Sequence, residues 1–263
     1  MSHAGKILKY EMQNLLRSRW LIATAAVLFI VTEVLFRFGG EPARTIASLV
    51  NIVLVVIPLM SVVLGTIYFY NSREFNELLL AQPVNRTSIY LGKLIGFAGA
   101  LCIAVLAGLG GPFLIHSYGL REHVQELVTL LVIACALVVI FVSLAFYAAT
   151  RFEDRIKGLG MTLAVWFFLT VIWDGLILLY VHIFRDYPYE GGLLGLVFLN
   201  PVDLGRINIL LQLDISALMG YTGAVFQKAF GTSRGLALSA FAMIVYATMP
   251  VLFGLRTFRR KDF

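Results

Sequence analysis

Two carboxylates, Glu33 and Asp174, stand inside long runs of apolar residues, where an ionisable side chain is costly to place. An acid in such a run is a candidate for chemistry, and either could belong to the catalytic dyad of an enzyme that works inside a membrane. Two structural alternatives compete with that interpretation. Glu33 precedes Arg37 by four residues, so both lie on one helical face and could form an ion pair. Asp174 could instead hydrogen-bond a neighbouring helix or a second copy of the chain.

The sequence lacks several motifs of common catalytic and metal sites. It has no G-x-x-x-x-G-K-[ST] phosphate loop, no H-E-x-x-H and no C-x-x-C. We therefore expect no catalytic residue, no metal site and no cofactor in this chain, and no hydrolysis of ATP by it. The histidines are scattered, and the cysteines lie in apolar runs where free thiols are expected: His3, His116, His123, His182, Cys102 and Cys135.

The composition points to a membrane protein. The chain is 60% apolar and only 14% charged, with a mean hydropathy of +0.88. A soluble domain carries about 25% charged residues, so most of this chain is expected to lie in lipid. The apolar runs are long and lack the alternation of barrel strands, which predicts an all-α fold. No basic tract is interleaved with aromatic residues, so the net charge of +6 does not indicate nucleic-acid binding.

Six apolar runs are long enough to cross a bilayer, which needs about 20 residues. With this division, about two thirds of the lysines and arginines fall on one side, which predicts that both termini are cytosolic. Charged residues interrupt the first 20 residues, so no cleavable signal peptide is expected there. The approximate limits of the spans are 19–38, 46–70, 89–116, 126–150, 158–184 and 234–257.

Residues 1–18 form a separate predicted element. Apolar residues recur at helical spacing from Ile7 to Leu16, while Lys9 and Arg17 take the opposite face. This pattern is typical of an amphipathic helix that lies in the membrane interface before the first span. The alternative is a basic flank whose only role is to orient that span.

The connection at 185–233 is too apolar for a solvated loop, yet none of its apolar runs is long enough to cross a membrane. We expect short interfacial or re-entrant helices there, on the outer side, which could cover a cavity or dock a partner. A turn and then a helix start are predicted at 200–203, because Pro201 disfavours helix at the residue before it. Asp203 is the expected cap of that helix.

A short charged segment, 71–88, separates the second span from the third. On the cytosolic side of a membrane protein, such a segment is where a soluble partner would push. The alternative is a solvated loop that only joins two spans. Its candidate functional residues are Arg73, Glu74, Glu77, Pro83 and Arg86.

Taken in this order, these features resemble the ABC-2 type permeases. In that family the connection between the second and third spans follows a pattern close to G-T-L-E-x-L-L-x-x-P-[VI]-x-R, and residues 77–86 fit its second half. Residues 74–76, Glu-Phe-Asn, stand where Gly-Thr-Leu is common. The Leu-Gly-Lys at 91–93 and the basic tail at 259–263 are also usual for the family.

The resemblance covers essentially the whole chain as a single permease domain, 1–263. It implies a non-catalytic subunit of the cell inner membrane that forms a homodimer and pairs with two copies of a separate cytosolic ABC ATPase. ATP and Mg²⁺ would bind in that ATPase. The 71–88 segment would be a coupling helix seated in a cleft of the ATPase.

Residues 199–206, Leu-Asn-Pro-Val-Asp-Leu-Gly-Arg, resemble a narrower branch of the family, the permeases of NosDFY transporters. These transporters support assembly of the copper–sulfur centre of nitrous oxide reductase in the periplasm. That resemblance implies a periplasmic β-helical partner (NosD-like) on the outer face and a NosF-like ATPase below. Four residues become candidates for the contact with the outer partner: Asn200, Pro201, Asp203 and Arg206.

Two other functions share the expected fold. One is the export of lipids or hydrophobic drugs, which would need a wide apolar groove. The other is a mechanical scaffold that transports nothing and transmits the motion of the ATPase to an outside protein.

Overall fold

The computed structural model describes most of the chain, and within that part all regular structure is helical. Six helical runs are long and apolar enough to cross a membrane, and they match the six predicted spans to within a few residues. Most of the predicted 1–18 helix, and Glu74, Glu77 and Pro83, lie outside the described residues. The described residues are 12, 14–15, 17–39, 42–73, 85–116, 123–184, 190–212, 231 and 233–260.

Four of these spans are uninterrupted α-helices, whereas the second and fifth each contain a π-helical turn that the hydropathy pattern did not predict. The uninterrupted helices are α2 (Arg19–Gly39), α6 (Arg86–Ile115), α7 (Val124–Arg151) and α13 (Ser233–Arg260). The second span consists of α3 (Pro42–Asn51), η1 (Ile52–Val56) and α4 (Ile57–Asn71). The fifth consists of α8 (Arg155–Phe167), η3 (Phe168–Ile172) and α9 (Trp173–Ile183).

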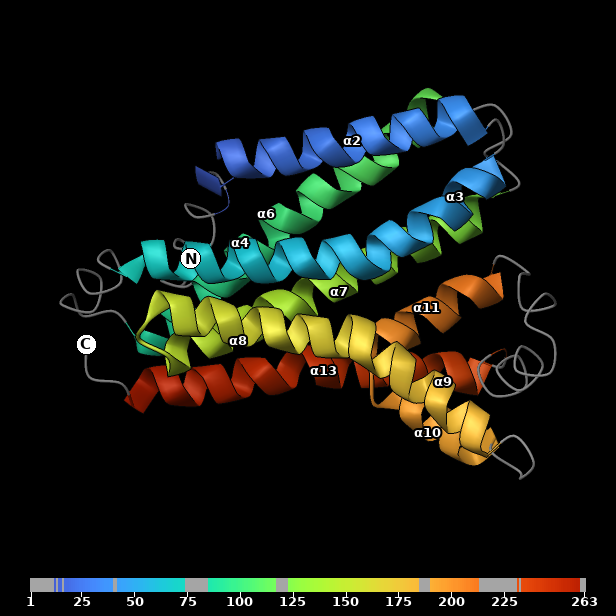
Figure 1. The fold of residues 1–263 in the computed structure, drawn as a ribbon. Helices are drawn as coiled ribbons and strands as arrows, with labels where there is room; N and C mark the ends of the chain where they lie inside the picture. The colour runs from blue at the N-terminus through green and yellow to red at the C-terminus, as the bar shows by residue number, and fades with distance from the viewer. Residues whose placement is uncertain are drawn as a thin grey trace.

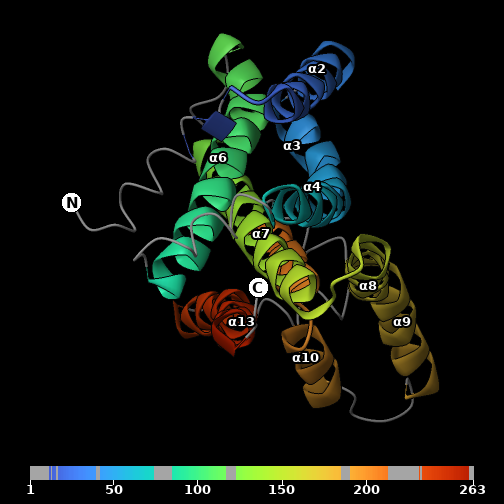
Figure 2. The ribbon, with the colours of Figure 1, turned by 90° about the vertical axis from the view of Figure 1, so that its left-hand side faces the viewer.

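Helix α7 lies at the centre of the bundle, with α4, α6, α8 and α13 packed around it (Figure 2). Its side chains Leu137, Phe141 and Phe146 are fully buried. Close approach is possible where small residues meet: a Cβ added to Gly65 of α4 would lie 3.2 Å from the Cβ of Ala145. Tight packing at small residues is what associates helices in lipid, because the apolar solvent does not drive them together.

Helices α2, α9 and α13 lie at the periphery of the bundle (Figure 1) and expose large apolar side chains, among them Phe38, Leu178 and Phe241. Such a surface suits a bilayer or a second copy of the chain rather than water. Helix α2 is attached mainly to α6. At Gly108 the two backbones approach so closely that an added Cβ would lie 2.8 Å from the Ala25 carbonyl oxygen.

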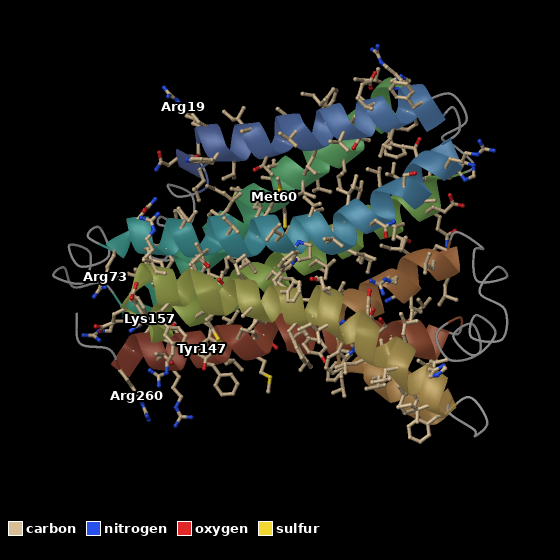
Figure 3. The ribbon with its side chains drawn as sticks, in the orientation of Figure 1. Arg19, Met60, Arg73, Tyr147, Lys157 and Arg260 are labelled. Atoms are coloured by element: carbon tan, nitrogen blue, oxygen red, sulfur yellow. The ribbon has the colours of Figure 1, made fainter. Side chains whose placement is uncertain are left out.

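Basic residues gather at one end of the bundle. Arg19, Arg73, Lys157 and Arg260 all lie at the left end of Figure 3, which we call the basic end. Helix α2 begins at this end, and α13 ends at it.

The opposite end contains a pair of short helices, α10 (Glu190–Phe198) and α11 (Pro201–Gln212), which we call the hairpin. The two axes bend by 112° at the break between them. In Figure 1 the hairpin enters from the end opposite the basic end, turns inside the bundle and returns to the same end. The short helices predicted in the 185–233 connection are therefore present at these residues, in an arrangement that fits a re-entrant pair, and 213–230 lie outside the described residues.

The helix start predicted at 200–203 is confirmed, but the predicted cap is wrong. Asn200 Oδ1 accepts a hydrogen bond from the Val202 N–H (3.1 Å), so Asn200 is the capping residue. Pro201 occupies the first helical position, where its missing N–H costs nothing, and this places the cap one residue earlier. The Asp203 carboxylate lies within the first turn and accepts from Asn200 Nδ2 (2.8 Å) instead.

Candidate functional site

The charged segment 71–88 begins directly after Tyr70, near the end of α4. Tyr70 holds this N-terminal flank of the segment in place. The Tyr70 hydroxyl donates to the carbonyl oxygen of Phe152 (2.8 Å) and lies 3.2 Å from that of Asp154, in the turn between α7 and α8. Its ring packs on Gly158, where any Cβ would collide with the hydroxyl. The end of α4 is therefore attached to the start of α8.

The second flank begins at Asn85, whose side-chain oxygen caps α6 by accepting from the Thr87 N–H (3.1 Å). Arg86 Nη1 donates to the carbonyl oxygen of Arg259 (3.2 Å). In return, Arg259 Nε donates to the Thr87 hydroxyl (2.9 Å). The start of α6 is thus attached to the end of α13. The two flanks of the segment are therefore attached to two different helix pairs, α4 with α8 and α6 with α13.

Helix α8 makes two further polar contacts with the second span, deeper in the bundle. The hydroxyl oxygens of Thr66 and Thr162 are 3.3 Å apart, and both residues are buried. The Trp166 indole N–H donates to the carbonyl oxygen of Val55 (3.2 Å), which belongs to the π-helical turn η1. Together with the Tyr70 contact, these bonds form what we call the α4–α8 ladder.

Four polar residues of α9 and the hairpin form a connected cluster, the polar junction: Asp174, Asn200, Asp203 and Arg206. Arg206 binds Asp174 with two nitrogens, Nη1 to Oδ1 (2.7 Å) and Nη2 to Oδ2 (2.8 Å). Nη1 also donates to Asp203 Oδ1 (3.0 Å). Asn200 Nδ2, besides its bond to Asp203, donates to the carbonyl oxygen of Leu169 in η3 (2.8 Å). The second π-helical turn therefore also accepts a side-chain donor.

The polar junction combines two carboxylates with one guanidinium. The Asp203 side chain is only 4% exposed, against 29% for Arg206 and 35% for Asp174. A bidentate pair between arginine and a carboxylate is among the stronger and more directional polar contacts. Without Arg206 the two carboxylates would lose the cation that stabilises them in a largely buried place. The arrangement is suited to holding α9 and the hairpin together.

The structure thus unites residues to which the sequence assigns two separate roles. Asp174 is a candidate intramembrane residue, whereas Asn200, Pro201, Asp203 and Arg206 are candidates for contact with an outer partner. Asn200, Pro201 and Asp203 are buried in the protomer, so they shape the hairpin rather than its exposed surface. Contact with an outer partner stays a prediction.

Glu33 lies in a separate place, near the end of α2. It forms the predicted ion pair with Arg37 (Nε to Oε1, 3.2 Å). Its other carboxylate oxygen lies 3.5 Å from Nδ1 of His116, at the end of α6. Nothing in the sequence indicates this contact, because Glu33 and His116 belong to different spans. His116 also stacks on Phe36, with ring centroids 5.1 Å apart.

Within the described part of the chain, no group of three or more histidine, cysteine, aspartate or glutamate side chains could hold a metal ion. Cys102 and Cys135 are free thiols, as predicted, although they are half-buried rather than fully buried. Cys102 Sγ lies 3.8 Å from the carbonyl oxygen of Cys135, which brings α6 and α7 together at this point.

The chain matches a family of known proteins over most of its length. The family described as ABC-2 family transporter protein matches residues 35–263. That range contains the last five spans, both flanks of the charged segment and the whole polar junction.

Two curated proteins are similar to the chain over most of its length. A protein of Pseudomonas aeruginosa described as probable ABC transporter permease protein NosY is 26% identical over 235 residues, which cover 81% of this chain and 84% of that protein. A protein of Stutzerimonas stutzeri with the same description is 25% identical over 281 residues, covering 99% of each chain.

Proposed function

The chain belongs to the ABC-2 transporter family and is an ABC transporter permease, and from that premise we propose that it couples a separate ATPase to work on the periplasmic side of the membrane. Its likeness to two proteins described as NosY supports a more specific role, in assembly of the copper–sulfur centre of nitrous oxide reductase. The six apolar helices make it a multi-pass membrane protein, which we place in the cell inner membrane.

We assign the basic end to the cytosol, and with it both termini. Positive residues favour the cytosolic side of a membrane, and Arg19, Arg73, Lys157 and Arg260 gather at this end (Figure 3). The proposed assembly contains two copies of the chain, two NosF-like ATPases at the basic end and a NosD-like β-helical protein at the hairpin end. ATP and Mg²⁺ belong to the ATPases, and the permease is non-catalytic.

The 71–88 segment is proposed as the element on which the ATPase acts. Its sequence supplies charges that an ATPase cleft could recognise, at Arg73, Glu74, Glu77 and Arg86, and Pro83 would end the helix before the third span. The described flanks support this role, because they attach the segment to α4 on one side and to α6 on the other.

The observation that carries the coupling proposal is a continuous series of polar contacts from the basic end to the hairpin. The α4–α8 ladder makes those two helices move together, and η3 continues α8 into α9. From there, Leu169 and Asp174 hold the hairpin through Asn200 and Arg206. Closure of the ATPases would shift the hairpin and so change the surface offered to the periplasmic partner, provided that the hairpin has two stable positions.

Affinity purification of the tagged chain from native membranes in mild detergent, followed by mass spectrometry, tests the assembly. We expect an ATPase and a periplasmic β-helical protein to be recovered with it. Recovery of neither partner would contradict the proposal.

The Thr66→Val variant tests the coupling route, because it removes one hydroxyl of the ladder and preserves the shape of the side chain. We expect normal recovery of the ATPase but weaker maturation of nitrous oxide reductase. Thr24→Val is the matched control, since the Thr24 hydroxyl is also buried but bonds only the Trp20 carbonyl of its own helix. Equal maturation in the two variants would remove the ladder from the mechanism.

One observation favours a second function, the export of lipids or hydrophobic drugs. A largely apolar cavity of about 550 Å³ lies between α7, α11 and α13. Its lining includes Ile133, Met243 and Ile244, with Asn208 and Gln212 as polar groups. Recovery of an ATPase alone, together with ATP-dependent transport in liposomes, would favour export over periplasmic maturation.

A further inference from the structure

A second cavity, of about 400 Å³, opens at the basic end between the start of α2, the end of α4 and the start of α8. Figure 2, which looks onto this end, shows α4 between α2 and α8. The volume lies near the lower limit for sites that bind small organic molecules. The cavity shares no residue with the polar junction or with the contacts that hold the two flanks of 71–88.

Five polar side chains line this cavity: Ser18, Trp20, Tyr68, Asn71 and Arg155. Tyr68 stacks on Phe97 (ring centroids 4.7 Å apart), whereas the side chains of Ser18, Trp20, Asn71 and Arg155 have no hydrogen-bond or ion-pair partner among the residues that the structure describes. They offer a hydroxyl, an indole N–H, a side-chain amide and a guanidinium. This set is rich in donors and carries one fixed positive charge, so it complements an anion with several acceptor oxygens.

The rest of the lining is apolar, with Leu21, Val63, Leu64, Ile67 and Phe97 among its residues. A free phosphate ion would leave this apolar surface uncovered. A ligand that carries both a phosphate group and a hydrocarbon chain would cover it, and each buried methylene contributes about 0.8 kcal/mol. The chemistry of the lining therefore points to a phospholipid.

The depth of the donors agrees with that choice. Trp20 lies in the first turn of α2, Asn71 ends α4 and Arg155 begins α8, so all three mark the limits of spans at the basic end. Lipid headgroups occupy this level of a bilayer, and interfacial tryptophans and basic pockets between spans are usual there. The nearby Asp154 carboxylate is engaged, because it caps α8 by accepting from the Ile156 N–H (2.8 Å).

We propose that this cavity binds one anionic phospholipid from the leaflet at the basic end, with its phosphate on Arg155 and one acyl chain among the apolar residues. The lipid would lie between the first span and the α4–α8 ladder, so its presence would set the distance between them. This inference rests on the cavity alone and stands whether or not the coupling proposal is correct.

Native mass spectrometry of the full-length purified chain, with phosphatidylglycerol or phosphatidylcholine added, tests the proposal. We expect retained phosphatidylglycerol and little phosphatidylcholine. Arg155→Gln should weaken retention about tenfold or more, because it removes a charge-assisted hydrogen bond. Lys157→Gln is the matched control: it removes an equal charge from the same helix, two residues on, outside the cavity lining.

A second variant, Ile67→Phe, tests the acyl-chain part of the site by filling the apolar chamber without changing charge. It should also lower retention of phosphatidylglycerol, in protein that elutes as the wild type does on size exclusion. Equal retention of the two lipids, or equal losses in Arg155→Gln and Lys157→Gln, would overturn the proposal. Full displacement of the lipid by inorganic phosphate would instead identify a site for the free ion, and so would also overturn it.

Discussion

The two ends of the bundle are held by different kinds of contact. At the basic end, the flanks of the 71–88 segment are tied by separate hydrogen bonds, such as those from Tyr70 and Arg86 to backbone carbonyls. At the hairpin end, the polar junction joins charged side chains through several bonds at once, and Asp203 is almost fully buried. A single hydrogen bond contributes about 1 kcal/mol net, whereas loss of one member of a buried ion pair costs several times more.

In the proposed mechanism, this difference predicts which contacts break during coupling and which persist. Weak separate bonds at the basic end can break and re-form as a partner pushes on the segment. The junction, in contrast, should stay intact and carry α9 and the hairpin as one piece. Variants that weaken the junction should therefore act on folding stability, and variants at the basic end should act on partner binding and coupling.

Arg206→Met is expected to have the largest effect, because it leaves the carboxylates of Asp174 and Asp203 without their cation. Loss of one partner of a fully buried pair costs about 3–5 kcal/mol, and we expect the lower end of that range because Arg206 and Asp174 are 29% and 35% exposed. Thermal unfolding in detergent measures it. The matched control is Arg37→Met, which breaks an ion pair whose arginine is 73% exposed and should cost less than about 1 kcal/mol. Arg37 lies in the last turn of α2, at the same end of the bundle as the junction, so equal losses in the two variants would show that the junction is no stronger than an exposed ion pair.

Asn200→Ala comes next in expected size. It removes the cap of α11 and the bonds to Leu169 and Asp203, so a loss of about 2–3 kcal/mol is expected. The measurement is again unfolding in detergent. Asn85→Ala, which removes an exposed cap at the other end of the bundle, is the control and should cost about 1 kcal/mol. A larger loss of stability in Asn85→Ala than in Asn200→Ala would contradict the proposal that the contacts at the hairpin end are the stronger ones.

Glu77→Lys addresses partner binding at the basic end rather than stability. Reversal of a charge at a protein interface is expected to weaken binding of the ATPase about tenfold or more while the permease stays folded. Co-purification of the ATPase with the variant measures this. Glu153→Lys, a charge reversal in the turn before α8, controls for a general change of surface potential. Binding as in the wild type by Glu77→Lys would argue that 71–88 is only a connecting loop.

Tyr70→Phe should have the smallest effect on stability, about 1 kcal/mol, because one hydroxyl is lost and the ring that packs on Gly158 remains. Its effect on coupling should be larger than its effect on folding. ATPase binding should persist while maturation of nitrous oxide reductase falls. Thr257→Val, which removes a hydroxyl that bonds the Phe253 carbonyl of its own helix, is the control. Indistinguishable maturation in the two variants would count against the Tyr70 attachment as a route for motion.

The spans could be predicted from the sequence because length and hydropathy are local properties. The order of packing could not. Every span is apolar, so nothing in the pattern marks α7 as the central helix or α9 as a peripheral one. The π-helical turns could not be predicted either, because the residues of Ile52–Val56 and Phe168–Ile172 are typical of ordinary α-helices.

The residues of the polar junction could be identified from the sequence, but their pairing could not. Asp174 stood out as a charge among apolar residues, and Arg206 through the resemblance of residues 199–206, yet their pairing spans 32 positions and depends on how the hairpin folds back. The error at the cap was avoidable. Asn200 and Asp203 are both good capping residues, and Pro201 in the first helical position favours the residue before it.

The hairpin also bears on whether the two termini lie on the same side of the membrane. Because α10 and α11 return to the end from which they came, we interpret them as a re-entrant pair rather than a seventh crossing, which leaves six spans, an even number. The start of α2 and the end of α13 lie at the same end of the bundle (Figure 1), and with six crossings they would open into the same compartment. A soluble domain fused to either terminus of this chain would reach the same side of the membrane, so an ATPase could be joined to the front or the back of the permease without any change in its orientation.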